Sequence, residues 1–132
     1  MKSLVVEDDF TSRFLLQTVL SRFGECHIAV NGLEAIQTVE ASQKLAAPYD
    51  FICMDIMMPE MDGQQALRRI RDLELQSGTV STNGAKIVMT TALDQPREVF
   101  AAFYELCDDY LVKPIDTHRL IDILHEHRLI SD

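Results

Sequence analysis

Acidic side chains follow two apolar runs of the chain, and they are the residues best suited to chemistry. Glu7, Asp8 and Asp9 come directly after a short β-branched run, and Asp55 comes directly after a longer one. If these runs are neighbouring parallel strands, three or four carboxylates converge at one edge of a sheet. Like charges at that spacing are costly, so the cluster requires a cation or raised pKa values. Carboxylate oxygens suit Mg²⁺, which also takes water and phosphoryl ligands.

Two further runs end in groups that can meet a phosphoryl group. Thr90 and Thr91 offer hydroxyls, and Lys113 offers an ammonium group. A carboxylate can attack phosphorus and form an aspartyl phosphate, while a metal ion and a lysine neutralise the developing charge. Each feature alone is common in solvated loops, and Asp9 is better suited to capping the helix that follows. The joint arrangement favours a phosphoryl-transfer site with Asp55 as the acceptor.

The elements that must position these groups alternate between strand and helix. Strand-like runs occur at residues 4–6, 26–30, 49–54, 86–90 and 110–112. Helical periodicity extends from residue 11 to residue 23 and begins again near residues 32, 63, 96 and 117. This pattern favours an α/β fold, a doubly wound, five-stranded parallel sheet with helices on both faces. The polar segment Ser77–Gly84 has no period and is interpreted as a surface loop.

Composition and charge exclude several classes of protein. The 132 residues suffice for one core, and 47% hydrophobic with 25% charged residues is typical of a globular domain. A net charge of −9 disfavours a nucleic-acid partner. Three cysteines without a CxxC pair fit a reducing cytosol. Neither a membrane-length apolar run nor a signal peptide is visible. We therefore expect one soluble, cytoplasmic domain over residues 1–132, with no nucleic-acid or membrane partner.

Four segments resemble the receiver domain of two-component response regulators, including the stand-alone chemotaxis regulator. They occur in family order and are Val5–Asp9, Met54–Gly63, Thr90–Ala92 and Tyr110–Ile115. The run Asp-Ile-Met-Met-Pro-Glu-Met-Asp-Gly is highly specific, and the resemblance covers nearly the whole chain. It implies a flavodoxin-like strand order of 2-1-3-4-5. It also implies a phosphorylation switch that modifies itself and does not turn over an external substrate.

The resemblance implies a role for each acidic residue. Asp55 would be the phosphoacceptor, and Asp8 would bind Mg²⁺ directly. Glu7 would hold the second position of the acidic pair, often acting through water. The backbone carbonyl of Met57 would complete the metal shell.

The resemblance also assigns the residues around the phosphoryl group. Lys113, joined to Pro114 by a cis peptide bond, and the hydroxyl of Thr91 would contact the phosphoryl oxygens. Thr91 and Tyr110 would form a bistable switch, whereas Thr90 is only the neighbour of the switch hydroxyl. Leu106 and Cys107 replace a Gly-Ala pair that is common in the family, which affects the turn beside Tyr110.

The implied phosphodonor is a phosphohistidine on a sensor histidine kinase or a histidine phosphotransfer protein. The implied downstream target docks on the face made by the fourth helix, fifth strand and fifth helix, since no output domain is expected after the fifth helix. Met57 and Leu93 are apolar and cannot position water, so we expect slow loss of the phosphate.

The main alternative is an unphosphorylated pseudo-receiver that only binds a partner. A phosphatase of the haloacid dehalogenase type requires an acid where this chain has Met57.

Overall fold

Five parallel strands form a single sheet in the computed structural model, which describes residues 1–58, 61, 63–78, 84–92 and 106–131. The strand order is β2-β1-β3-β4-β5, so the predicted fold class and strand order are confirmed. The strands are β1 (Ser3–Val6), β2 (Cys26–Ala29), β3 (Phe51–Asp55), β4 (Lys86–Thr91) and β5 (Asp109–Val112).

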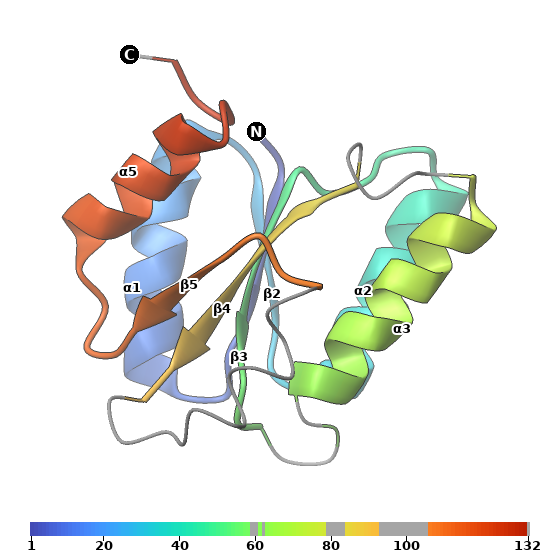
Figure 1. Ribbon diagram of the computed structural model, residues 1–132, viewed down its shortest axis with the longest axis horizontal. Coiled ribbons are helices and arrows are strands. Elements are labelled where there is room, and N and C mark those ends of the chain that lie inside the picture. Colours follow the sequence, from blue (N-terminus) through green and yellow to red (C-terminus); the bar gives the residue numbers. More distant parts are fainter. Residues whose placement is uncertain (59–60, 62, 79–83, 93–105, 132) are drawn as a thin grey trace.

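Helices cover both faces of this sheet (Figure 1). Helices α1 (Phe10–Leu20) and α5 (Thr117–Glu126) lie together on one face, while α2 (Gly32–Lys44) and α3 (Gly63–Gln76) lie on the other. Because successive strand residues point to opposite faces, a strand covered on both sides must be apolar throughout. In β3, Ile52 packs into the α2/α3 core and Cys53 into the α1/α5 core. The strands of the sequence are therefore continuous apolar runs, because helices cover both faces of the sheet.

Side-chain caps begin three of the helices. Asp9 Oδ2 accepts a hydrogen bond from Ser12 N–H at 2.9 Å at the start of α1, which is the capping role predicted for it. Asn31 and Asp116 cap α2 and α5 in the same way. The cap of α1 matters for function because it fixes the loop between β1 and this helix.

Several element boundaries differ from the predicted ones by one to three residues, and two of these differences have a clear physical cause. Helix α1 ends at Leu20, and a 3₁₀ turn, η1 (Ser21–Phe23), carries the chain to Gly24. Such a turn satisfies the last carbonyl groups of the helix with tighter hydrogen bonds. Asp55 is the last residue of β3 and does not follow it, because it still pairs with Thr90 of β4.

Two predicted features fall where the chain is not described. The helix expected from residue 96 lies outside the described residues, as does the middle of the Ser77–Gly84 loop. Leu106 and Cys107, which replace the expected Gly-Ala pair, pack against the α2/α3 core.

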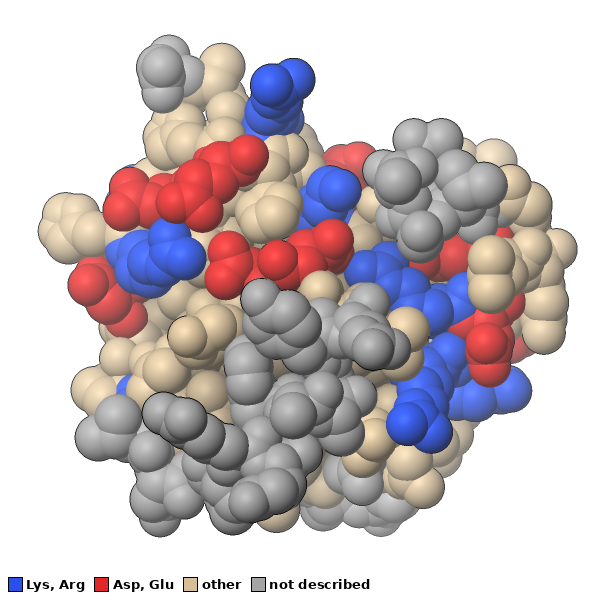
Figure 2. Space-filling view, in the orientation of Figure 1, with Lys and Arg blue, Asp and Glu red and all other residues tan. Residues whose placement is uncertain are grey.

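The described surface carries charges of both signs. Over the face drawn in Figure 2, acidic and basic side chains lie next to one another. Within the described part of the chain, no helix is both long enough and apolar enough to cross a membrane.

Candidate functional site

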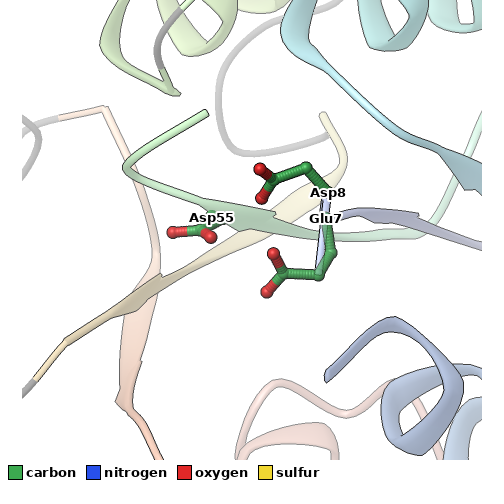
Figure 3. A group of neighbouring side chains, drawn as sticks. All are labelled: Glu7, Asp8 and Asp55. Atoms are coloured by element: carbon green, nitrogen blue, oxygen red, sulfur yellow. The ribbon is translucent and has the colours of Figure 1, made fainter. Parts of the chain in front are cut away.

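Three carboxylates converge at the edge of the sheet where β1 and β3 end (Figure 3). Val6 pairs with Met54 in parallel register, so the residues that follow them are neighbours. Glu7, Asp8 and Asp55 each place a carboxylate oxygen within 4.8 Å of the other two. Glu7 is fully buried, Asp55 is 7% exposed, and Asp8 is exposed. The structure therefore brings together the acidic residues that the sequence singled out.

Lys113 reaches two of these carboxylates from the end of β5. Its Nζ lies 2.6 Å from Glu7 Oε1 and 3.0 Å from Asp55 Oδ2. Burial alone would lower the pKa of Lys113, but its close contacts and charge interactions with the carboxylates of Glu7 and Asp55 outweigh that effect and raise the pKa. The peptide bond between Lys113 and Pro114 is cis, as predicted. A fixed positive charge thus lies beside the predicted acceptor.

Glu7 is the most perturbed group of the cluster. Burial raises its pKa to about 7, and the neighbouring Asp55 carboxylate adds to this rise, whereas the Lys113 ammonium opposes it. Glu7 Oε1 touches Lys113 as an ion pair but has no partner in hydrogen-bonding geometry among the described residues. A hard divalent cation would supply the missing positive charge to this oxygen and to the carboxylates of Asp8 and Asp55. The donor set therefore fits Mg²⁺.

Three other predicted site residues come from the segment after β3, from β4 and from β5. Met57 donates its backbone N–H to Asp55 Oδ1 at 3.1 Å, and its side chain is 60% exposed. The buried hydroxyl of Thr91 donates to the carbonyl of Ala92 at 3.3 Å. Tyr110 is exposed on β5. The metal role of the Met57 carbonyl and the switch role of Thr91 and Tyr110 stay predictions.

Arg13 is a residue of this edge that the sequence motifs did not indicate. Its Nη1 donates to the backbone carbonyls of Glu7 at 3.1 Å and Asp8 at 3.3 Å. It ties the first turn of α1 to the backbone that presents the two acids. The sequence pattern that could have indicated this contact is a basic residue one turn into the helix that follows an acidic loop.

Comparison with known proteins identifies the family of this chain. The model of the response regulator receiver domain matches residues 3–125. The chain belongs to this family. It is therefore a receiver domain of two-component signalling, and its Glu7, Asp8 and Asp55 cluster fits the magnesium and phospho-aspartate site of such domains. Receiver domains undergo self-phosphorylation and do not turn over external substrates.

Full-length and partial matches occur among curated relatives of this receiver domain. The two-component response regulator ORR41 of Oryza sativa subsp. japonica is 33% identical over 98% of this chain and 95% of its own length. The chemotaxis protein CheY of Bacillus subtilis is 28% identical, with 93% of each chain covered. The sensor histidine kinase GacS of Pseudomonas protegens is 34% identical over 92% of this chain, which spans only 12% of that kinase.

Solved structures of receiver domains share the fold. The receiver domain of the histidine kinase CKI1 from Arabidopsis thaliana, complexed with Mg²⁺, superposes with a TM-score of 0.79 at 29% identity, covering 95% of this chain and 90% of that one. The receiver domain of Ssk1 from Saccharomyces cerevisiae, co-crystallised with the histidine phosphotransfer protein Ypd1, gives a TM-score of 0.76 at 29% identity, covering 96% and 87%.

Proposed function

We propose that this receiver domain is switched by phosphorylation of Asp55, with Mg²⁺ held by Glu7, Asp8, Asp55 and the backbone carbonyl of Met57. One observation carries the proposal. A nearly buried carboxylate lies between two further carboxylates and a lysine that contacts it at 3.0 Å. This arrangement supplies a nucleophile, a place for a cation and a charge for the phosphoryl oxygens. The magnesium complex of the CKI1 receiver supports the choice of cation.

The residues of the chain prepare Asp55 for attack on phosphorus. The backbone N–H of Met57 holds Oδ1, and Lys113 Nζ holds Oδ2, so the carboxylate has a fixed orientation. One carboxylate oxygen forms a bond to phosphorus as the P–N bond of the donor breaks, and the imidazole leaves with the electron pair. Lys113 then neutralises charge on the phosphoryl oxygens, and bound Mg²⁺ would supply further positive charge there.

Incubation with acetyl phosphate and Mg²⁺, followed by mass spectrometry, tests this proposal. We expect one phosphoryl group on the peptide that contains Asp55, and none in Asp55→Asn or after chelation of the cation. The control Asp50→Asn, an exposed acid at the other end of β3, should be labelled like the wild type. An unmodified wild type under these conditions would favour the pseudo-receiver that only binds a partner.

We propose that the phosphodonor docks on an aromatic pair beside the site. Phe10 and Phe14 of α1 are 67% and 59% exposed, and their rings stack with centroids 6.0 Å apart. Phe10 directly follows the acidic loop that carries Asp8, so a protein seated on this pair has its phosphohistidine close to Asp55. The Ssk1 receiver in complex with Ypd1 supports a histidine phosphotransfer protein as donor, and the match to GacS supports a kinase.

Phe14→Ala should slow transfer from a phosphorylated histidine phosphotransfer protein about tenfold, while labelling by acetyl phosphate stays unchanged. Leu45→Ala is the matched control, because Leu45 is an apolar side chain 78% exposed at the far end of α2. Equal effects of the two substitutions would remove Phe14 from the docking surface.

We propose that Thr91 and Tyr110 relay phosphorylation to a downstream target on the face of the fourth helix, β5 and α5. In this structure Tyr110 is 42% exposed, and Val112 beside it on β5 is 38% exposed, which leaves an apolar strip for binding. A pull-down with phosphorylated and unphosphorylated protein tests the relay. Tyr110→Ala should lower the difference between the two forms without altering the labelling of Asp55.

We propose that the phosphate is lost slowly without a phosphatase. The side chain of Met57 is exposed at the site and offers no hydrogen bond to an attacking water, while Leu93 lies outside the described residues. Replacing Met57 with Asn should shorten the phosphate half-life, measured after removal of the donor. A wild-type half-life of seconds in Mg²⁺ alone would contradict the proposal.

A further inference from the structure

Thr90 is a buried hydroxyl at this edge of the sheet for which the fold supplies no partner. Its side chain is 1% exposed, and within the described part of the chain its Oγ1 makes no hydrogen bond. A buried hydroxyl without a partner costs on the order of 1–3 kcal/mol, and few such groups occur in native proteins. This cost points to another state of the protein in which the bond is made.

Strand register places Thr90 beside Asp55. The two residues are direct partners in the β3–β4 ladder, and neighbouring strands lie about 4.8 Å apart. Val88 of β4 and Cys53 of β3 both pack into the α1/α5 core, so by alternation Thr90 and Asp55 share that face. The same alternation turns Thr91 toward the opposite face of the sheet. Thr90, which the motif treats as a mere neighbour, therefore lies on the side of the acceptor.

Lys113 must pass over this position to make its ion pairs. It leaves the end of β5 and contacts carboxylates on β3 and β1, and β4 lies between β5 and β3. At present Lys113 is the side-chain donor to Asp55 Oδ2. When Lys113 turns to a phosphoryl group, the Asp55 carboxyl group loses this donor. Thr90, its register partner on β4, carries a hydroxyl that has no other partner among the described residues.

We propose that Thr90 is a positioning residue whose hydroxyl donates to the Asp55 carboxyl group once Lys113 turns to the phosphoryl oxygens. The proposal rests on the phosphorylation of Asp55 proposed above. A donor at this point holds the acceptor in one orientation during transfer. It also gives the buried hydroxyl the partner that the present state lacks.

The experiment compares Thr90→Val, which keeps the shape and removes the hydroxyl, with Thr90→Ser, which keeps the hydroxyl. We expect the rate of Asp55 labelling by acetyl phosphate to fall about tenfold in Thr90→Val and to stay near wild type in Thr90→Ser. The free energy of unfolding without Mg²⁺ should be equal or higher in Thr90→Val, because an unpaired hydroxyl is removed. The control Ser42→Ala, a buried hydroxyl of α2 already bonded to the Val39 carbonyl, should lower stability and leave labelling unchanged.

The outcomes separate this inference from the proposed function. A wild type that is labelled on Asp55, with Thr90→Val labelled at the same rate, would overturn the role of Thr90 alone. Equal slowing in Thr90→Val and Thr90→Ser would also overturn it, since the cause would then be packing. A wild type that takes no label at all would overturn the proposed function, and the role of Thr90 with it. If Thr90→Val does not fold, Thr90→Ala provides the variant without a hydroxyl.

Discussion

Two clusters of charged side chains lie at opposite ends of the sheet. The first, around Arg71, is complete, because its donors and acceptors bond to one another. Arg71 of α3 donates to the carboxylates of Glu74 at 2.7 Å and Asp108 at 3.0 Å. It also donates to the backbone carbonyls of Ala85 at 2.9 Å and Leu106 at 3.0 Å. Each of its three nitrogens therefore has a partner, and the contacts join α3 to the segments that lead into β4 and β5.

The second cluster, at the ends of β1 and β3, is incomplete. Glu7 Oε1 and Thr90 Oγ1 are buried without hydrogen-bond partners among the described residues, and burial raises the pKa of Glu7 to about 7. Two buried or nearly buried carboxylates there share one lysine. This difference distinguishes a cluster that stabilises the fold from a cluster that binds a ligand. A cluster that only holds the fold satisfies its own bonds, whereas a cluster built for a ligand leaves bonds for that ligand to make.

Removal of one charge from each cluster should have opposite effects on stability. Arg71→Met removes the positive charge beside the carboxylates of Glu74 and Asp108 and the side-chain donor to two backbone carbonyls. The Arg71 side chain is only 12% exposed, so we expect a loss of about 3–5 kcal/mol. Asp55→Asn removes a like charge from beside Glu7 and should cost nothing or stabilise. Urea unfolding of the metal-free proteins, followed by circular dichroism, measures both changes. Equal losses in the two variants would break the comparison.

The sequence predicted the incomplete cluster better than the complete one, for a physical reason. The acids and Lys113 stand at the ends of strands, and a parallel sheet brings those ends together once the strand order is known. Arg71 instead bonds to backbone carbonyls of Ala85 and Leu106, which carry no residue-type signal. The early end of α1 at Leu20 was missed because a 3₁₀ turn continues the helical periodicity to Phe23. The side-chain orientations of Thr91 and Tyr110 could not be predicted, because the proposed switch would give one sequence two states.

The pH dependence of stability should come from the incomplete cluster. The pKa of Glu7 rises from 4.5 to about 7 on folding, so the folded protein binds the extra proton between these values. Stability of the metal-free protein should therefore fall as pH rises from about 5 to about 7, by up to about 3 kcal/mol. The paired Lys113 adds no slope here, because its raised pKa affects stability only above pH 10.

Urea unfolding in EDTA at several pH values tests this expectation. Glu7→Gln cannot ionise, so its stability should stay flat through this range and exceed that of the wild type above pH 7. Arg71→Met should keep the wild-type slope at a lower overall stability. A slope that survives in Glu7→Gln would show that Glu7 is not the titrating group.

Added Mg²⁺ should complete the second cluster and leave the first untouched. A cation that binds only the folded state stabilises by about 1.4 kcal/mol at ten times its dissociation constant. Asp8 is exposed, so Asp8→Asn should keep the stability of the metal-free fold and lose most of this gain. Arg71→Met, weakened at the opposite end, should keep the full gain. A melting-temperature series with and without Mg²⁺ measures all three proteins. If Arg71→Met lost the gain as Asp8→Asn does, the two ends of the sheet would be coupled, and the structural cluster would take part in the switch.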